Sequence, residues 1–170
     1  MEQPKIHQAD PIRDAARVRE LFWEYLQWAN AKVNETYGVN FEIQTLLEED
    51  MQKLGIFMPP KGRLLLSDGT GELSGLACLR DNGDGIGEIK RMYVRPAYRG
   101  QGIGRALLDH LLNEARAIGY RCIRLDSAGF MSDAHRLYRS LGFQEIAPYP
   151  GSEIPIEFQK NWIFMEKMLG

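Results

Sequence analysis

A glycine-rich turn between a strand pattern and a helical pattern constrains the fold of this chain more than any other feature. Glycines occupy positions 100, 102 and 104, after an apolar run that ends near Val94 and before a helical repeat that begins at Leu107. Glycine adopts backbone conformations that other residues avoid, so successive N–H groups can converge on one point without a side-chain shield. Together with the positive end of the following helix, this turn predicts a cradle for a phosphate or pyrophosphate group.

The charges around this turn indicate an anionic ligand. Residues 88–105 contain five basic residues and one acidic residue, a local charge of +4 in a chain whose overall net charge is −2. Arg99 and Arg105 are placed to reach phosphates, whereas Lys90, Arg91 and Arg95 are expected to be solvated strand positions. Because the overall charge is slightly negative, the composition favours neither nucleic acid nor an anionic membrane surface as a partner.

The spacing of the glycines excludes two common phosphate-binding motifs. A Walker A loop needs Lys and then Ser or Thr after its last glycine, but Gly104 is followed by Arg105 and Ala106. A dinucleotide fingerprint would need glycine at position 105, or glycine or alanine at position 107, where the chain has Arg and Leu. The remaining pattern is Arg-x-x-Gly-x-Gly, formed by Arg99, Gly102 and Gly104.

The rest of the chain predicts a mixed sheet covered by helices. Apolar residues recur every three or four positions from Val18 to Ala29, which predicts a long amphipathic helix that starts near Asp10 and Pro11. Gly55 is expected to end a second helix in a left-handed conformation. The further elements are strands near 5–7, 63–67, 73–80, 88–95, 121–126, 143–147 and 162–168, and helices over 46–54, 107–118 and 132–141.

Two motifs together carry a resemblance to a known family. The pattern at residues 99–104 closely resembles the acyl-coenzyme A signature of the Gcn5-related N-acetyltransferase (GNAT) superfamily, and residues 134–143, which read A-H-R-L-Y-R-S-L-G-F, match the family's alanine-to-tyrosine helix followed by Gly-Phe. The resemblance extends from about residue 60 to the end. It implies a single α/β (α+β) domain over residues 1–170, with a mixed, mostly antiparallel sheet of about six to seven strands and about four helices.

The resemblance also implies acetyl-CoA as co-substrate and assigns roles to residues. Backbone groups of Met92, Tyr93 and Val94 would bind the pantetheine arm, and the Val94 N–H would stabilise the oxyanion. Tyr138 would be the acid that protonates the leaving thiolate, and Glu88 the base that deprotonates the amine through water. The pyrophosphate would lie over the turn and the start of the helix, formed by Arg99, Gly100, Gln101, Gly102, Ile103, Gly104 and Arg105.

Alternatives remain open for several of these residues. Tyr138 on a helix is ordinarily a packing residue, and Glu88 is equally an exposed charge at a strand end. Many relatives have an Asn near residue 127, where this chain reads L-D-S-A-G, so Ser127 or Ser132 would replace its contact. The three histidines show no metal spacing, and no metal is expected. Cys78 and Cys122 lie in apolar runs and are expected to be buried, reduced thiols.

The sequence predicts the acceptor of the acetyl group less specifically than its donor. Residues 1–55 hold 10 acidic and 6 basic residues, and residues 144–170 hold 4 and 2, so both acceptor-side segments suit a cationic amine. A small-molecule amine is favoured over a protein amine. The alternative function is a non-catalytic acyl-CoA sensor or partner-recognition module on the same fold.

By resemblance a homodimer is expected. With no apolar run long enough to cross a bilayer, and no apolar signal segment, we expect a cytoplasmic protein without a membrane partner.

Overall fold

The computed structural model describes residues 2–170 and contains one seven-stranded sheet with the strand order β1-β2-β3-β4-β5-β7-β6. Within the sheet formed by residues 2–170, only the β4–β5 pair is parallel, and every other neighbouring pair is antiparallel. The strands are β1 (Ile6–Gln8), β2 (Arg63–Asp68), β3 (Leu73–Asp81), β4 (Ile86–Val94), β5 (Cys122–Ala128), β6 (Gln144–Ile146) and β7 (Trp162–Met168). The predicted mixed, mostly antiparallel sheet is confirmed.

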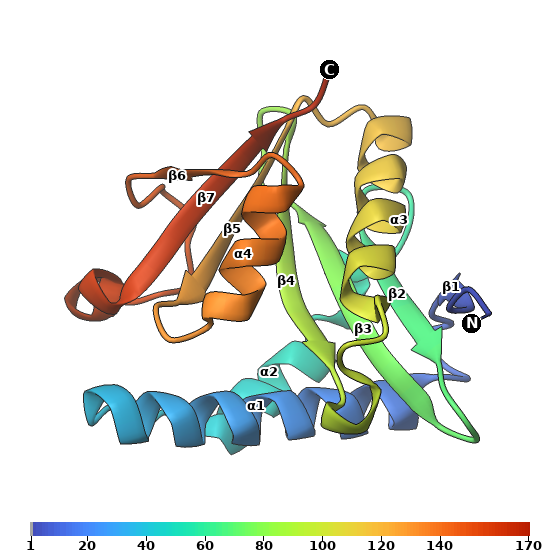
Figure 1. The fold of residues 1–170 in the computed structure, drawn as a ribbon, viewed down its shortest axis with the longest axis horizontal. Helices are drawn as coiled ribbons and strands as arrows, with labels where there is room; N and C mark the ends of the chain where they lie inside the picture. The colour runs from blue at the N-terminus through green and yellow to red at the C-terminus, as the bar shows by residue number, and fades with distance from the viewer. Residues whose placement is uncertain (1) are drawn as a thin grey trace.

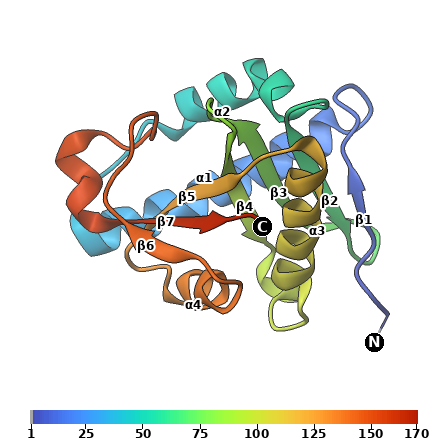
Figure 2. The ribbon, with the colours of Figure 1, turned by 90° about the horizontal axis from the view of Figure 1, so that it is seen from above.

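The helices form two layers, one on each face of the sheet (Figures 1 and 2). On one face, α1 buries the predicted apolar stripe, including Leu21 and Phe22, against β2 and β3. On the other face, Leu107, Leu108 and Leu111 of α3 pack on the sheet beside α4. The helices are α1 (Ala15–Tyr37), α2 (Ile43–Gln52), α3 (Ile103–Ile118) and α4 (Ser132–Ser140), with short 3-10 turns η1 (Leu54–Phe57), η2 (Pro96–Tyr98) and η3 (Ile156–Asn161).

Two helix ends differ from the prediction. Asp10 accepts hydrogen bonds from the N–H groups of Ile12 and Arg13, at 2.9 and 2.7 Å, and so closes a turn that precedes α1. The second helix ends at Gln52, and Gly55 lies inside η1 without a left-handed backbone. The chain turns early here because Leu54 and Phe57 of η1 are both buried in the core beneath α1.

The central strands β4 and β5 separate along their length, which creates the space for a site. Their parallel pairing covers only Ile86–Glu88 of β4 and Cys122–Arg124 of β5. Beyond it, β4 continues to Val94 beside β3 and β5 continues to Ala128 beside β7, so the two strands diverge like the arms of a V (Figure 1). Backbone groups on the inner edges of both arms are therefore available to a ligand.

A β-bulge near the middle of β4 determines which of its side chains face this space. Tyr93 pairs with Leu76 and Lys90 with Cys78, so β4 contains one more residue than β3 over this stretch. Arg91 has a φ of 50°, a left-handed conformation that is uncommon for a residue with a side chain. In a regular strand the side chains of Lys90 and Tyr93 would lie on opposite faces of the sheet. Because of the extra residue, both lie on the same face, the one that α1 covers.

Three further observations concern the described residues as a whole. Over residues 2–170, no helix is both long and apolar enough to span a bilayer. Over the same residues, no group of three or more His, Cys, Asp or Glu side chains is arranged to hold a metal ion. Cys78 and Cys122 are both buried and free, as the sequence predicted.

Candidate active site

A cavity of about 840 Å³ occupies the space between the diverging arms of β4 and β5. Its walls come from α1, α2, the turn before α3, α4 and the loop between β6 and η3. The predicted residues that line it are Met92, Tyr93, Val94, Arg99, Gly100, Gly102, Ile103, Gly104, Arg105, Ser127 and Tyr138. Gln101 and Glu88 are not among the lining residues. The structure thus brings most of the predicted site residues, far apart in sequence, to one cavity.

The glycine turn forms one end of the cavity. Gly100 and Gly102 have φ values of 76° and 79°, a left-handed conformation that strains any residue with a side chain. A Cβ at either position would meet no protein atom within 4 Å. The N–H groups of the first turn of α3, which begins at Ile103, have no intrahelical acceptor, and the helix dipole adds partial positive charge there. This end of the cavity can hold a phosphate group.

The open edge of β4 continues from that turn into the cavity. The Arg95 N–H donates to the Ser74 carbonyl of the neighbouring strand segment at 2.8 Å. Successive residues of a strand direct their N–H groups to opposite sides, so the Val94 N–H points away from β3, toward the space that β5 leaves. An extended ligand lying along this edge could accept hydrogen bonds from the backbone N–H groups of β4, as an added strand would.

Arg99 and Arg105 supply positive charge at the same end. The Arg99 guanidinium carbon lies 5.1 Å from the ring centre of Trp28 and 5.6 Å from that of Tyr93, distances typical of cation–π contacts. Its Nε donates to the Val94 carbonyl at 2.9 Å. Arg105 is exposed on α3 and pairs with Asp109 at 3.4 Å. Both arginines can reach an anion in the cavity through flexible side chains.

Tyr138 lies on α4, and its hydroxyl reaches toward β4. The side chain is 6% exposed and its hydroxyl lies 3.7 Å from the Met92 sulfur. Burial raises the pKa of Tyr138 above its ordinary value near 10, and the negative charge of Asp126 adds to this effect. The phenol is therefore protonated at neutral pH and can donate a proton into the cavity.

Ser127 has a hydrogen-bond partner that the sequence did not predict. The Ser127 hydroxyl lies 3.0 Å from Nε2 of His135, and both side chains are buried. Burial lowers the pKa of His135, with a smaller contribution from Arg139, so the ring is neutral near pH 7. The spacing of eight residues, from the end of β5 to α4, gives no signal in the sequence alone. His135 fixes the orientation of the hydroxyl that stands near the expected Asn position.

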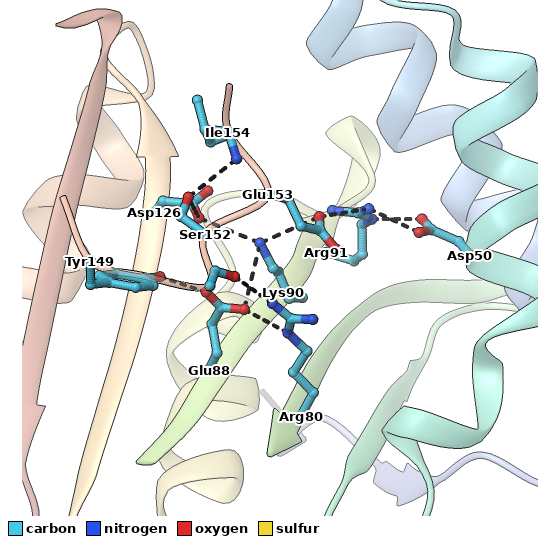
Figure 3. Close-up of polar contacts among 11 residues, drawn as sticks. Asp50, Arg80, Glu88, Lys90, Arg91, Asp126, Tyr149, Ser152, Glu153 and Ile154 are labelled. Carbon is cyan, nitrogen blue, oxygen red and sulfur yellow. Dashed lines mark hydrogen bonds and ion pairs between the residues drawn. The ribbon is translucent and has the colours of Figure 1, made fainter. Parts of the chain in front are cut away.

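Glu88 is buried at the closed end of the V rather than exposed at a strand end (Figure 3). One carboxylate oxygen accepts from Arg80 Nε at 2.7 Å, and the other accepts from the Tyr149 hydroxyl at 2.6 Å. The Lys90 Nζ lies 3.7 Å from the first of these oxygens. Glu88 is thus separated from the cavity, and Lys90 is the cavity-lining group that adjoins it.

The expectation that Lys90, Arg91 and Arg95 are solvated strand positions is wrong. Lys90 and Arg91 are 6% and 13% exposed, and each is surrounded by carboxylates from other elements. Arg95 is 9% exposed and pairs with Glu20, Glu24 and Glu72 at 2.7–2.9 Å. These contacts link residues 23 to 75 positions apart, so no local pattern predicts them.

The chain is similar to known proteins of one family. The family model of the Acetyltransferase (GNAT) family matches residues 15–143. An uncharacterized N-acetyltransferase of Schizosaccharomyces pombe is 30% identical over 84% of this chain and 84% of its own. Among solved structures, YncA of Salmonella typhimurium with its cofactor acetyl-CoA is 26% identical, with a TM-score of 0.64, covering 99% of this chain and 95% of that one.

A second solved structure extends the likeness in fold. The PaiA N-acetyltransferase of Thermoplasma acidophilum, in complex with coenzyme A, has a TM-score of 0.75 and is 19% identical, covering 99% of this chain and 100% of that one. The chain belongs to the GNAT family of acetyltransferases. It is an acyltransferase whose co-substrate is acetyl-CoA, and the glycine cradle, the open edge of β4 and the two arginines fit that molecule's phosphates and extended arm.

Proposed function

We propose that this enzyme transfers the acetyl group of acetyl-CoA to a primary amine of a small molecule, by direct attack of the amine on the thioester. The observation that carries the proposal is the position of Tyr138. Its protonated hydroxyl lies 3.7 Å from the Met92 sulfur, in the cavity that the glycine turn lines at one end, and the rest of the cavity, which we call the acceptor end, is left for the amine.

The donor would bind mainly through the backbone. Its pyrophosphate would lie on Gly100, Gly102 and the first turn of α3, with Arg99 and Arg105 supplying charge. Its arm would run along Met92 to Val94, and Ser127, held by His135, would supply one further hydrogen bond. Acetyl-CoA supplies an activated acyl group, and the protein's part is to orient and polarise it.

Two groups of the chain would assist the chemical step. The amine nitrogen forms a bond to the acetyl carbon, the carbon–sulfur bond breaks, the nitrogen loses one proton and the sulfur gains one. The Val94 N–H, directed into the space between β4 and β5, would stabilise the negative oxygen that forms during attack. Tyr138 would donate its proton to the departing sulfur and then recover one from solvent.

Glu88 is the proposed final acceptor of the amine proton. Because its carboxylate does not line the cavity, the proton would have to pass through an intermediate group. A water molecule held by Lys90 would be that group, since Lys90 lines the cavity and its Nζ lies 3.7 Å from Glu88. Burial lowers the pKa of Lys90, but Asp126 and Glu88 outweigh burial and raise it, so Lys90 stays charged and offers no lone pair of its own to the proton.

The loop between β6 and η3 favours a small acceptor over a polypeptide. Its residues are fixed at the acceptor end of the cavity by the Tyr149 hydrogen bond to Glu88 and by a 3.0 Å hydrogen bond from Arg80 to the Gly151 carbonyl.

A homodimer is also proposed, to be checked by light scattering. Two free, buried cysteines suit a reducing compartment, and we infer a cytoplasmic location.

The test is a thiol-release assay with acetyl-CoA and a panel of amines, comparing the wild type with Tyr138→Phe. We expect kcat to fall about 100-fold or more with little change in acetyl-CoA affinity, since general acid catalysis contributes 10²–10⁴-fold. Tyr120→Phe is the matched control, because this buried tyrosine donates to the Lys61 carbonyl and lies outside the cavity lining. Equal turnover of Tyr138→Phe and wild type would remove Tyr138 from the mechanism.

A further inference from the structure

A cluster of seven charged side chains, four of which line the cavity, lies at its acceptor end, and we call it the floor cluster (Figure 3). They come from α2, from β3, β4 and β5, and from the loop after β6. Its members are Asp50, Arg80, Glu88, Lys90, Arg91, Asp126 and Glu153, joined by ion pairs of 2.7–3.7 Å. Four carboxylates face three cations, so the cluster carries one surplus negative charge when all are ionised.

The cations of the floor cluster are satisfied without Glu153. Arg91 makes a two-point contact with Asp50, at 2.7 and 2.9 Å, which is the geometry that a guanidinium and a carboxylate prefer. Arg80 is paired with Glu88 at 2.7 Å, and Lys90 with Asp126 at 3.4 Å. Glu153 remains, with one oxygen 3.4 Å from both Lys90 and Arg91. The surplus charge is therefore that of Glu153.

Glu153 is also the member of the cluster that a ligand can reach most readily. Its side chain is 44% exposed, against 6% for Lys90 and 8% for Asp126, and it lines the cavity. Burial raises the pKa of Glu153, but Lys90 and Arg91 outweigh burial and hold the pKa below its ordinary value, so the carboxylate is charged at neutral pH.

The charge balance selects the sign of the ligand. A ligand carboxylate that reached Lys90 or Arg91 would be a fifth carboxylate beside three cations, unless Glu153 left its place. A ligand cation would instead neutralise the cluster with no rearrangement. The lining of the cavity also includes apolar and aromatic side chains of Val33, Phe41, Ile154 and Trp162, and aromatic faces attract cations as well as apolar groups.

The cation that Glu153 binds cannot be the attacking nitrogen at the moment of reaction. A nitrogen held as an ammonium ion has no lone pair, and a carboxylate with a lowered pKa is a poor acceptor for its proton. We therefore propose that the acceptor is a small amine that carries a second cationic group on an apolar body, and that Glu153 recognises this second group. This rests on the proposed function and names its acceptor class.

Three six-carbon amines that differ only at the far end test the proposal, namely 1,6-diaminohexane, hexylamine and 6-aminohexanoate. For the wild type we expect kcat/KM to be about tenfold higher for the diamine than for hexylamine, and lowest for 6-aminohexanoate, because a charged hydrogen bond contributes about this factor. In Glu153→Gln the diamine should lose about tenfold while hexylamine changes little. Glu157→Gln, in the adjacent η3 turn, exposed and outside the lining, is the matched control.

The outcomes of these assays distinguish failure of the acceptor proposal from failure of the proposed function. A preference for 6-aminohexanoate, or a diamine preference that survives in Glu153→Gln, would overturn the proposal. So would acetyl-CoA binding by calorimetry with no turnover of any of the three amines, although the donor site would then stand. Absence of acetyl-CoA binding in the same titration would instead overturn the proposed function, so the two failures are distinguishable.

Discussion

The two ends of the cavity are built by different means. At the donor end, the chain presents backbone N–H groups from Gly100 to Gly104 and from the edge of β4, and few side chains are needed. At the acceptor end, the floor cluster joins five elements through charged side chains. A backbone cradle depends on short-range sequence and can be common to many relatives. A side-chain cluster depends on long-range contacts, and a single substitution can change what it binds.

The largest effect that separates the two ends is expected from Glu88→Gln. A buried carboxylate with two strong partners is lost, so stability should fall by about 3 kcal/mol, and kcat should fall about 100-fold if Glu88 accepts the amine proton. Denaturant unfolding and the pH dependence of kcat measure the two effects. Tyr149→Phe is the matched variant, since it removes one hydrogen bond and leaves the carboxylate in place. Equal kcat values in both variants would reduce Glu88 to a structural role.

The next effect concerns the pair that anchors α2 to β4. Asp50→Ala leaves the buried Arg91 guanidinium with Glu153 alone, and we expect a loss of about 3 kcal/mol in the free energy of unfolding. Glu49→Ala, at an exposed position of the same helix, should change it by no more than about 0.5 kcal/mol. A similar small change in both variants, by urea unfolding, would mean that the floor cluster does not hold α2 in place.

A smaller and more selective effect is expected at the donor end. Gly102→Ala strains a backbone with a φ of 79° and should weaken acetyl-CoA binding about tenfold, the equivalent of 1–2 kcal/mol. Gly71→Ala meets the same strain, at a φ of 75° with open space around it, in the turn between β2 and β3. It should cost similar stability and leave acetyl-CoA affinity unchanged. Equal affinity losses in both variants would show that the effect is global.

The smallest effect is a pH dependence of stability from His135. Its pKa is lowered in the folded state, so below about pH 6.5 the unfolded chain binds a proton that the folded chain does not. Stability is therefore present above the unfolded pKa and is lost as the pH falls through that value toward the folded pKa. Thermal unfolding between pH 7.5 and 5.5 should show a loss in the wild type that is smaller in His135→Gln. An identical slope would contradict a buried neutral ring.

The same contrast explains what the sequence could predict. The glycine turn, the helix that ends at Gly119 and the Tyr138 helix follow local patterns, and their positions in the structure agree with them within a few residues. Contacts of Arg91 with Asp50 or of Glu88 with Tyr149 join positions 41 and 61 residues apart. No periodicity encodes them, and the β4 bulge that places Tyr93 on the same face as Lys90 has no glycine to mark it.

The central claim is that this cavity is an acetyl-CoA site, and calorimetric titration of the wild-type protein tests it most directly. We expect acetyl-CoA and free coenzyme A to bind with one site per chain, and Mg-ATP and NADH not to bind. Gly102→Ala, tested in parallel, should bind both coenzyme A species about tenfold more weakly. Failure of folded wild-type protein to bind either coenzyme A species, or equal binding of Mg-ATP, would contradict the assignment of the glycine turn and the open edge of β4.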